Sequence, residues 1–165
     1  MLFDWNRTEA EGFYDRSVHE LFEQAADKFP DATAVVCEGR SLTYAELDER
    51  ANELAWYLRS KGVQQNARIG IYIERSIEMV IGLLGILKSG SAYVPLDPIY
   101  PSDRDAFMFE DAGIDVVLTL TSLKDRISKG KFCIIMIDGD REAISKESSA
   151  RLKLDDDDSR LAYVI

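Results

Sequence analysis

The stretch RIGIYIERSIEMVIGLLGILKSGSAYVP, from Arg68 to Pro95, decides the fold of this chain. Its opening residues alternate as a β-strand does, with Tyr72 on one face and a row of isoleucines on the other: Ile69, Ile71 and Ile73. Residues 77–87 are apolar almost all round, which is typical of a helix buried on most sides. A second strand is predicted at residues 92–94. Strand, helix and strand in this order predict an α/β fold.

The same alternation of elements continues on both sides of this stretch. The residue pattern predicts helices at about 18–28, 43–60, 102–112 and 123–128, and strands at 34–37, 41–43, 116–120, 132–137 and 161–165. Thr43 and Glu46 have the spacing of a capping box at the start of the second of these helices. The polar segment 138–160 has no clear period. We therefore expect a layered α/β domain with a mostly parallel sheet over residues 17–165, preceded by a linker at 1–16.

Composition excludes several classes of protein. The chain has 165 residues, 46% of them hydrophobic, which is enough to build a core. Its 30 acidic and 20 basic residues give a net charge of −10, which argues against non-specific binding to nucleic acid or to an anionic membrane surface. No basic and apolar leader opens the sequence, and the longest apolar run is too short to span a bilayer. We expect a cytoplasmic protein, with no nucleic-acid and no membrane partner.

Cys37 and Cys133 are far apart, and each lies in an apolar stretch. There is no Cys-x-x-Cys pair, so the pattern favours two buried, reduced thiols over a disulfide or a reactive thiol.

The residues that could carry chemistry form no complete motif. Neither a dinucleotide fingerprint nor a Walker P-loop is present. Gly82 and Gly85 fall inside a predicted helix, where no backbone N–H is free to hold phosphate, so we interpret them as packing elements that let another backbone come close. His19 is the only histidine, and no nucleophile or second ligand is spaced to work with it. A surface or capping role is favoured over a catalytic base, and a histidine-based zinc site has no support.

Charged residues give two further candidate sites. The run Asp155–Asp158 could bind Ca²⁺ or Mg²⁺, but a bare run does not arrange oxygen ligands around an ion, so a solvated loop is favoured. Lys88 and Asp97 flank the strand at 92–94 and could pair in a cleft. The alternative, which we favour, makes Lys88 a favourable charge at its helix C-terminus and Asp97 a turn residue before Pro98. The residues themselves assign no catalytic, cofactor-binding or metal-binding position.

Longer strings of residues resemble a known family. LTYAEL at 42–47, continued by DERANELAWYLRSKGV to Val63, resembles the first signature of the amino-acid adenylation domains of nonribosomal peptide synthetases. ERSIEMVIGLLGILKSGSAYVPLDPIYP at 74–101 resembles the second. WNRT at 5–8 and VHELFEQAA at 18–26 resemble the linker and first helix before them. LAYVI at 161–165 resembles the strand that leads into the glycine-rich phosphate loop. The resemblance covers nearly the whole chain.

The resemblance implies an activity for the complete enzyme. Family members condense an amino acid with ATP and magnesium to an aminoacyl-adenylate, then pass the acyl group to the phosphopantetheine thiol of a carrier protein. The family's phosphate loop, ribose ligand, most of its amino-acid pocket and its late lysine come after the strand that 161–165 resembles, so none is carried over to a position here. We therefore expect a chain truncated before the phosphate loop, inactive alone, whose partners are the rest of the adenylation domain and the carrier and condensation domains.

The sequence departs from the family pattern at two places. Ser89 stands where the family usually has alanine. Asp105 stands where the family usually has isoleucine, and if that position is buried its carboxylate needs a partner, for which Arg104 and Lys124 are candidates.

Two alternatives to this function remain open. One is a non-catalytic interaction or complementation module, because an incomplete parallel sheet leaves an edge and an apolar face to be covered. The other is a piece of an aryl- or fatty-acyl-adenylating ligase, although AYVPLDP favours the amino-acid branch.

Overall fold

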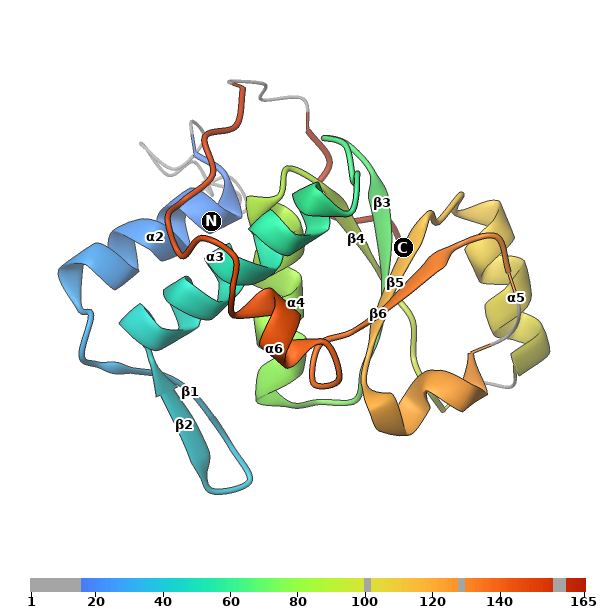
Figure 1. Ribbon diagram of the computed structural model, residues 1–165, viewed down its shortest axis with the longest axis horizontal. Helices are drawn as coiled ribbons and strands as arrows, with labels where there is room; N and C mark the ends of the chain where they lie inside the picture. The colour runs from blue at the N-terminus through green and yellow to red at the C-terminus, as the bar shows by residue number, and fades with distance from the viewer. Residues whose placement is uncertain (1–15, 100–101, 128–129, 156–159) are drawn as a thin grey trace, which may run out of the picture.

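A computed structural model describes residues 16–99, 102–127, 130–155 and 160–165, with the backbone alone at 102–105. Figure 1 shows a central sheet with one helical layer on each face. The elements are, in chain order, α2 (Val18–Lys28), β1 (Thr33–Cys37), β2 (Arg40–Thr43), α3 (Tyr44–Ser60), β3 (Arg68–Tyr72), α4 (Ile77–Lys88), β4 (Ala92–Pro95), α5 (Ser102–Asp111), β5 (Val116–Thr119), the 3₁₀-helix η1 (Thr121–Arg126), β6 (Cys133–Met136) and α6 (Arg141–Ile144).

The main sheet has the order β4-β3-β5-β6, and every neighbouring pair is parallel. Ile69 of β3 lies opposite Tyr93 on one side and Val116 on the other. The chain therefore adds β4 to one side of β3 and β5 to the other, which makes β3 the point where the strand order reverses. The predicted α/β fold with a mostly parallel sheet is confirmed.

The two faces of the sheet bury separate clusters of apolar side chains. The isoleucines of β3 pack with α3 and α4, whereas Tyr72 packs on the opposite face with Phe109 of α5. In β5, Leu118 belongs to the first cluster and Val117 to the second, and both are fully buried. Burial on both faces explains why these strands are apolar throughout instead of alternating.

The hairpin and its following helix form as the sequence predicts. Glu38 and Gly39 both have positive φ (49° and 77°), the geometry of a tight two-residue hairpin turn between β1 and β2. At the start of α3, the Thr43 hydroxyl accepts from the Glu46 N–H at 3.2 Å. The Glu46 carboxylate in turn accepts from the Thr43 N–H at 2.8 Å. The predicted capping box is therefore present.

The two glycines of α4 are packing elements, as the sequence analysis predicts. A Cβ at Gly85 would lie 2.7 Å from the nearest Leu54 side-chain atom of α3. A Cβ at Gly82 would lie 3.0 Å from Ile71 of β3. The absence of side chains lets α4 lie close to its neighbours on both sides. The predicted close approach of another backbone was wrong, because side chains fill the space at both glycines.

Several local details differ from the predictions. The short helix predicted at 123–128 forms as a 3₁₀-helix over 121–126, and the segment 138–160, for which no element was predicted, contains α6. Near the C-terminus only Tyr163 forms a β-bridge, to Tyr93 of β4. The predicted apolar face of α2 is only partly buried, since Val18 and Phe29 are 58% and 51% exposed. Residues 1–15 of the predicted linker lie outside the described residues.

The prediction of two buried thiols was also wrong. Both cysteines are free in the structure, but Cys37 is half-buried and Cys133 is exposed. Cys37 ends a hairpin strand, and Cys133 begins β6 at the edge of the sheet, so neither position is covered on both sides.

Candidate functional site

The carboxyl ends of the parallel strands meet at one edge of the sheet, and β3 lies between β4 and β5, which both follow it in the chain. Ligands of open α/β sheets bind at such an edge, outside the point where the strand order reverses. In this chain two polar side chains at that edge, Thr119 and Asp97, are already hydrogen-bonded within the fold. The Thr119 hydroxyl donates to the Tyr72 carbonyl at 2.9 Å, and one Asp97 carboxylate oxygen accepts from the Ile99 N–H at 2.9 Å. Both groups are used within the fold.

A cluster of charged side chains lies instead around Lys88, at the C-terminus of α4 and close to the start of β4. Only 2% of the Lys88 side chain is exposed. Its ammonium group forms ion pairs with Glu23 of α2 and, at 2.7 Å, with Asp48 of α3. It also lies 5.8 Å from the ring centre of Phe22. An ammonium group removed from water needs such partners, so Lys88 joins three helices at one buried point.

Arg151 extends this cluster to the surface. Its guanidinium donates to both carboxylate oxygens of Asp27, at 2.8 and 3.0 Å, and to one oxygen of Asp48 at 3.2 and 3.0 Å. It also donates to the Glu23 carbonyl at 3.2 Å. The hydrogen bond to Asp27 and the charges of Asp48 and Glu23 raise the pKa of Arg151 above its ordinary value. We call Lys88, Glu23, Asp48, Asp27 and Arg151 the charge network.

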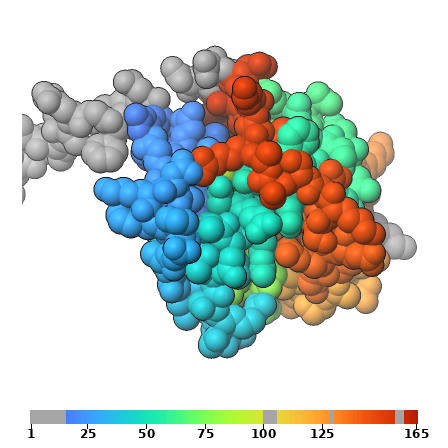
Figure 2. Space-filling model, turned by 60° about the vertical axis from the view of Figure 1, so that its left-hand side comes forward, coloured from blue at the N-terminus to red at the C-terminus, as the bar shows by residue number. Residues whose placement is uncertain are grey.

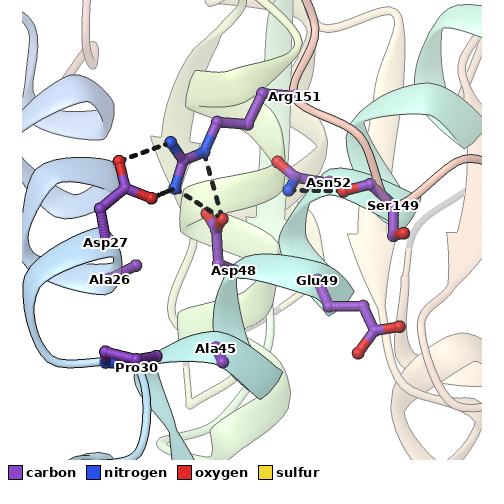
Figure 3. A pocket seen from close by; sticks show the side chains of 9 residues that line it. All are labelled: Ala26, Asp27, Pro30, Ala45, Asp48, Glu49, Asn52, Ser149 and Arg151. Carbon is purple, nitrogen blue, oxygen red and sulfur yellow. Dashed lines mark hydrogen bonds and ion pairs between the residues drawn. The ribbon is translucent and has the colours of Figure 1, made fainter.

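A surface pocket of about 360 Å³ opens beside the charge network. Figure 3 shows Arg151 lying between Asp27 and Asp48, with the amide of Asn52 directed at Ser149 and the Glu49 carboxylate pointing away from them. Asn52 donates to the Ser149 carbonyl at 2.9 Å. The pocket carboxylates of Asp27 and Asp48 are thus already paired, and the polar groups around it do not converge on one point.

Two titratable groups have pKa values shifted mainly by burial. Burial raises the pKa of Glu53, which is 8% exposed, and Arg141 at 3.7 Å only partly opposes the shift. Burial lowers the pKa of His19, against the opposing effect of Glu23 and Glu20. His19 lies in the first turn of α2, with its ring 3.0 Å from the Ser17 hydroxyl. It contacts Ser17, the N-cap residue of α2, through a side-chain bond and not through the helix backbone. The surface or capping role favoured from sequence stays a prediction.

The structure does not pair Lys88 with Asp97. Lys88 occupies the last turn of α4, as the favoured interpretation predicts, and Asp97 is the predicted turn residue. The sequence analysis missed that Lys88 is buried and pairs with Glu23 and Asp48. These partners lie 65 and 40 residues away in the chain, so no local spacing could have indicated them. Arg151 was missed for the same reason.

The remaining candidates add no site among the described residues. Within the described residues no three or more of His, Cys, Asp and Glu lie together as a metal site would require. Asp155 is exposed, and Asp156–Asp158 lie outside the described residues. Asp105 belongs to α5, but its side chain and that of Arg104 also lie outside them, while Lys124 is exposed on η1. Ser89 is fully buried and its hydroxyl donates to the Ile86 carbonyl at 2.7 Å.

Among the residues that the structure places, no helix has the length and apolar character needed to cross a membrane.

Comparison with known proteins gives a family. The family described as AMP-binding enzyme matches residues 22–164. A linear gramicidin synthase of Brevibacillus parabrevis is 46% identical over 161 residues, which is 98% of this chain and 2% of the synthase. Bacitracin synthase 2 of Bacillus licheniformis is 42% identical over 165 residues, 100% of this chain and 6% of the synthase. The chain thus spans only a small part of the length of these relatives.

Solved structures agree with this assignment. The nonribosomal peptide synthetase FmoA3, crystallised with AMPPNP bound, matches 99% of this chain and 18% of its own length, with a TM-score of 0.89 and 32% identity. The N-terminal subdomain of Klebsiella oxytoca NpsA matches 86% of this chain and 35% of its own length, with a TM-score of 0.74 and 24% identity, which shows the fold alone. The chain belongs to the AMP-binding enzyme family, and its fold is that of part of the N-terminal subdomain of an adenylation domain.

Proposed function

We propose that this chain is the opening part of an adenylation domain that activates an amino acid with ATP and loads it onto the phosphopantetheine of a carrier protein. The observation that carries the proposal is the match to FmoA3, which extends over 99% of the chain at a TM-score of 0.89 and 32% identity. The gramicidin and bacitracin synthases among its relatives support the amino-acid branch.

Among the residues that the structure describes, none form a site that fits magnesium or phosphate. Ser76 caps the N-terminus of α4, and its hydroxyl accepts from the Met79 N–H at 3.2 Å. This N–H is therefore not available to a phosphate group. Glu78 places a carboxylate in the same turn, which disfavours a bound anion. ATP and magnesium therefore bind through other parts of the parent enzyme, and this chain supplies the sheet and the helical layers against which those parts are built.

The direct test of this proposal is amino-acid-dependent exchange between ATP and pyrophosphate. We expect the 165-residue chain alone to give no exchange with any of the proteinogenic amino acids. We expect the protein encoded by the full reading frame to give exchange with one or a few of them. Exchange by the chain alone would show that the site lies within it, and a full-length protein that is inactive with every amino acid would refute amino-acid activation. Aryl and fatty acids belong in the same assay, because they test the alternative ligase.

A second candidate function is a non-catalytic module that docks the rest of its domain from another chain. A row of exposed apolar side chains beside β4 favours it: Leu161, Tyr163 and Ile165, which are 58%, 53% and 99% exposed. Size-exclusion chromatography of the 165-residue chain distinguishes the two proposals. Self-association that Tyr163→Arg abolishes would support the docking module, and a compact monomer at all concentrations would argue against it.

A further inference from the structure

The C-terminal residues return to the far edge of the sheet. The last strand of the sheet, β6, lies at one edge, whereas Tyr163 forms a parallel bridge with Tyr93 of β4 at the opposite edge. The Tyr93 N–H donates to the Ala162 carbonyl at 3.1 Å, and the Val164 N–H donates to the Tyr93 carbonyl at 3.0 Å. A parallel neighbour must begin at the same end as β4, so the chain has to cross the whole sheet before it pairs.

No long helix makes this crossing in the part of the chain that the structure describes. The helix α6 has 4 residues, and residues 145–155, which we call the crossing segment, follow it without regular structure. Figure 2 shows this segment lying across the outside of α3 toward α2. Two of its carbonyl groups accept hydrogen bonds from side chains of α3. Asn52 donates to the Ser149 carbonyl at 2.9 Å, and the Trp56 indole N–H donates to the Ala150 carbonyl at 2.7 Å.

Arg151 is the strongest attachment of the crossing segment. Its guanidinium binds Asp27 through two hydrogen bonds and reaches Asp48 and the Glu23 carbonyl as well. Asp48 is held in turn by the buried ammonium group of Lys88. A planar guanidinium suits this role, because its fixed fork of donors can satisfy a carboxylate and further acceptors at once. One residue of the crossing segment is therefore fastened to both α2 and α3.

Beyond Arg151 the crossing segment reaches the end of the sheet where β4 begins. A Cβ at Gly90 would lie 3.2 Å from a Leu154 methyl group, so Leu154 packs against the turn between α4 and β4. Gly90 has φ +81°, and β4 begins two residues later at Ala92. The crossing segment therefore ends close to the amino end of β4, where a strand parallel to β4 has to begin.

We propose that Arg151 is a positioning residue on which the pairing of residues 161–165 with β4 depends. Arg151 is held by several hydrogen bonds to α2 and α3, whereas Asn52 and Trp56 each donate a single hydrogen bond to the crossing segment. Loss of the Arg151 contacts frees the crossing segment and releases residues 161–165 from β4, while the four-stranded sheet stays intact. This inference concerns the fold of the chain and goes beyond the proposed reaction, so it stands or fails independently of amino-acid activation.

Amide hydrogen exchange measured by NMR on the 165-residue chain tests the proposal. The reporters are the amides of Tyr93 and Val164, whose hydrogen bonds join β4 to the C-terminal residues. The references are the amides of Leu96 and Cys133, which bond to Ile71 and Asp115 within the four-stranded sheet. In Arg151→Ala we expect the reporters to exchange at least about tenfold faster relative to the references, as local opening requires. Arg151→Lys, which keeps the charge but not the fork, is expected to restore part of the protection.

The matched control is Lys146→Ala. It removes a cation from the crossing segment, but its partner is Glu142, at 2.7 Å, and both side chains are exposed. We expect reporters and references to exchange as in the unaltered chain. The proposal is overturned if Arg151→Ala leaves the reporters unchanged, or if reporters and references accelerate together, since that would be global destabilisation. If Arg151→Ala does not fold, Asp27→Ala, which removes the carboxylate that Arg151 binds through two hydrogen bonds and whose side chain is 66% exposed, carries the same test with the same two outcomes.

Discussion

At the scale of single residues, Lys88 places a buried charge where α2, α3 and α4 meet. Its ammonium group forms ion pairs with Glu23 and Asp48 and lies over the ring of Phe22. The charges of such a network offset a large cost of desolvation, so removal of one partner leaves the others uncompensated. The sequence places Lys88 at a helix C-terminus, where a lysine is common, and only the packed structure gives it this second role.

Lys88→Met tests the buried ion pairs. The methionine keeps the length and apolar stem of the side chain but leaves Glu23 and Asp48 without their cation. We expect the free energy of unfolding, measured by urea denaturation, to fall by about 3–5 kcal/mol. The control is Lys146→Met, which breaks an exposed pair and should cost no more than about 0.5 kcal/mol. Equal losses in the two variants would contradict the role assigned to Lys88.

For Glu53 we expect a substitution to raise the stability of the fold, whereas Lys88→Met is expected to lower it. Burial raises its pKa, so the folded state binds its proton more readily than the unfolded state does. Its contribution to stability is therefore fully present below the ordinary carboxyl pKa and is lost as the pH rises through the raised value. We expect Glu53→Gln to be more stable than the unaltered chain at pH 7, with no gain at pH 3.5. Glu49→Gln, one turn earlier and exposed, should show no such pH-dependent gain in urea denaturation.

At the scale of elements, local sequence sets where helices begin and which positions carry small residues. The capping box of α3 and the glycines of α4 follow from residue types at fixed spacing, which is why both could be predicted. Leu54 fills the space left by Gly85. The sequence could not indicate this contact, because Leu54 lies on another helix. The 3₁₀ geometry of η1 and the partial exposure of α2 were equally beyond local pattern, since both depend on which neighbours the elements meet.

Gly85→Ala weighs helix propensity against packing. Alanine favours a helix over glycine by roughly 1 kcal/mol. Here its Cβ would lie 2.7 Å from the nearest Leu54 side-chain atom, so we expect a net loss of about 1–3 kcal/mol in the free energy of unfolding. The matched experiment repeats the substitution in a Leu54→Ala background, where the loss should disappear. A penalty of the same size in both backgrounds would mean that the close approach is not its cause.

Thr43→Ala removes the hydroxyl that caps α3. The Glu46 N–H loses its acceptor, and we expect the free energy of unfolding to fall by about 1 kcal/mol. Thr43→Ser keeps the hydroxyl and should retain most of the stability in the same urea titration. If the serine variant loses as much as the alanine variant, packing of the threonine methyl group and not the cap is responsible.

At the scale of the whole molecule, carboxylates fasten distant segments together. A hydrogen bond from Arg151 lowers the pKa of Asp27, and one from Arg40 lowers the pKa of Glu78. A lowered pKa means that the folded state binds fewer protons than the unfolded state in the acid range. The stability that these contacts contribute is present above the ordinary carboxyl values and is lost as the pH falls through the lowered ones.

We therefore expect the urea midpoint to fall between pH 5 and pH 3 and to depend little on these two groups between pH 5 and pH 7. Glu78→Gln should flatten the fall, because the variant has no proton to gain at that position. Asp31→Asn, which removes an exposed carboxylate, serves as the control and should follow the unaltered chain. A midpoint that is constant down to pH 3 would contradict the assigned role of the carboxylates.

The sequence by itself determined the type and order of most elements, the parallel α/β class and the family, because periodicity, caps and turn residues act over a few neighbouring positions. The signature strings also lie within continuous segments, so they can be read without a fold. Only the tertiary structure decided the partners of Lys88, the position of Arg151 and the return of Tyr163 to β4. These contacts join residues 40 to 128 positions apart, and their energy comes from burial and charge pairing that exist only once the helices and the sheet have packed.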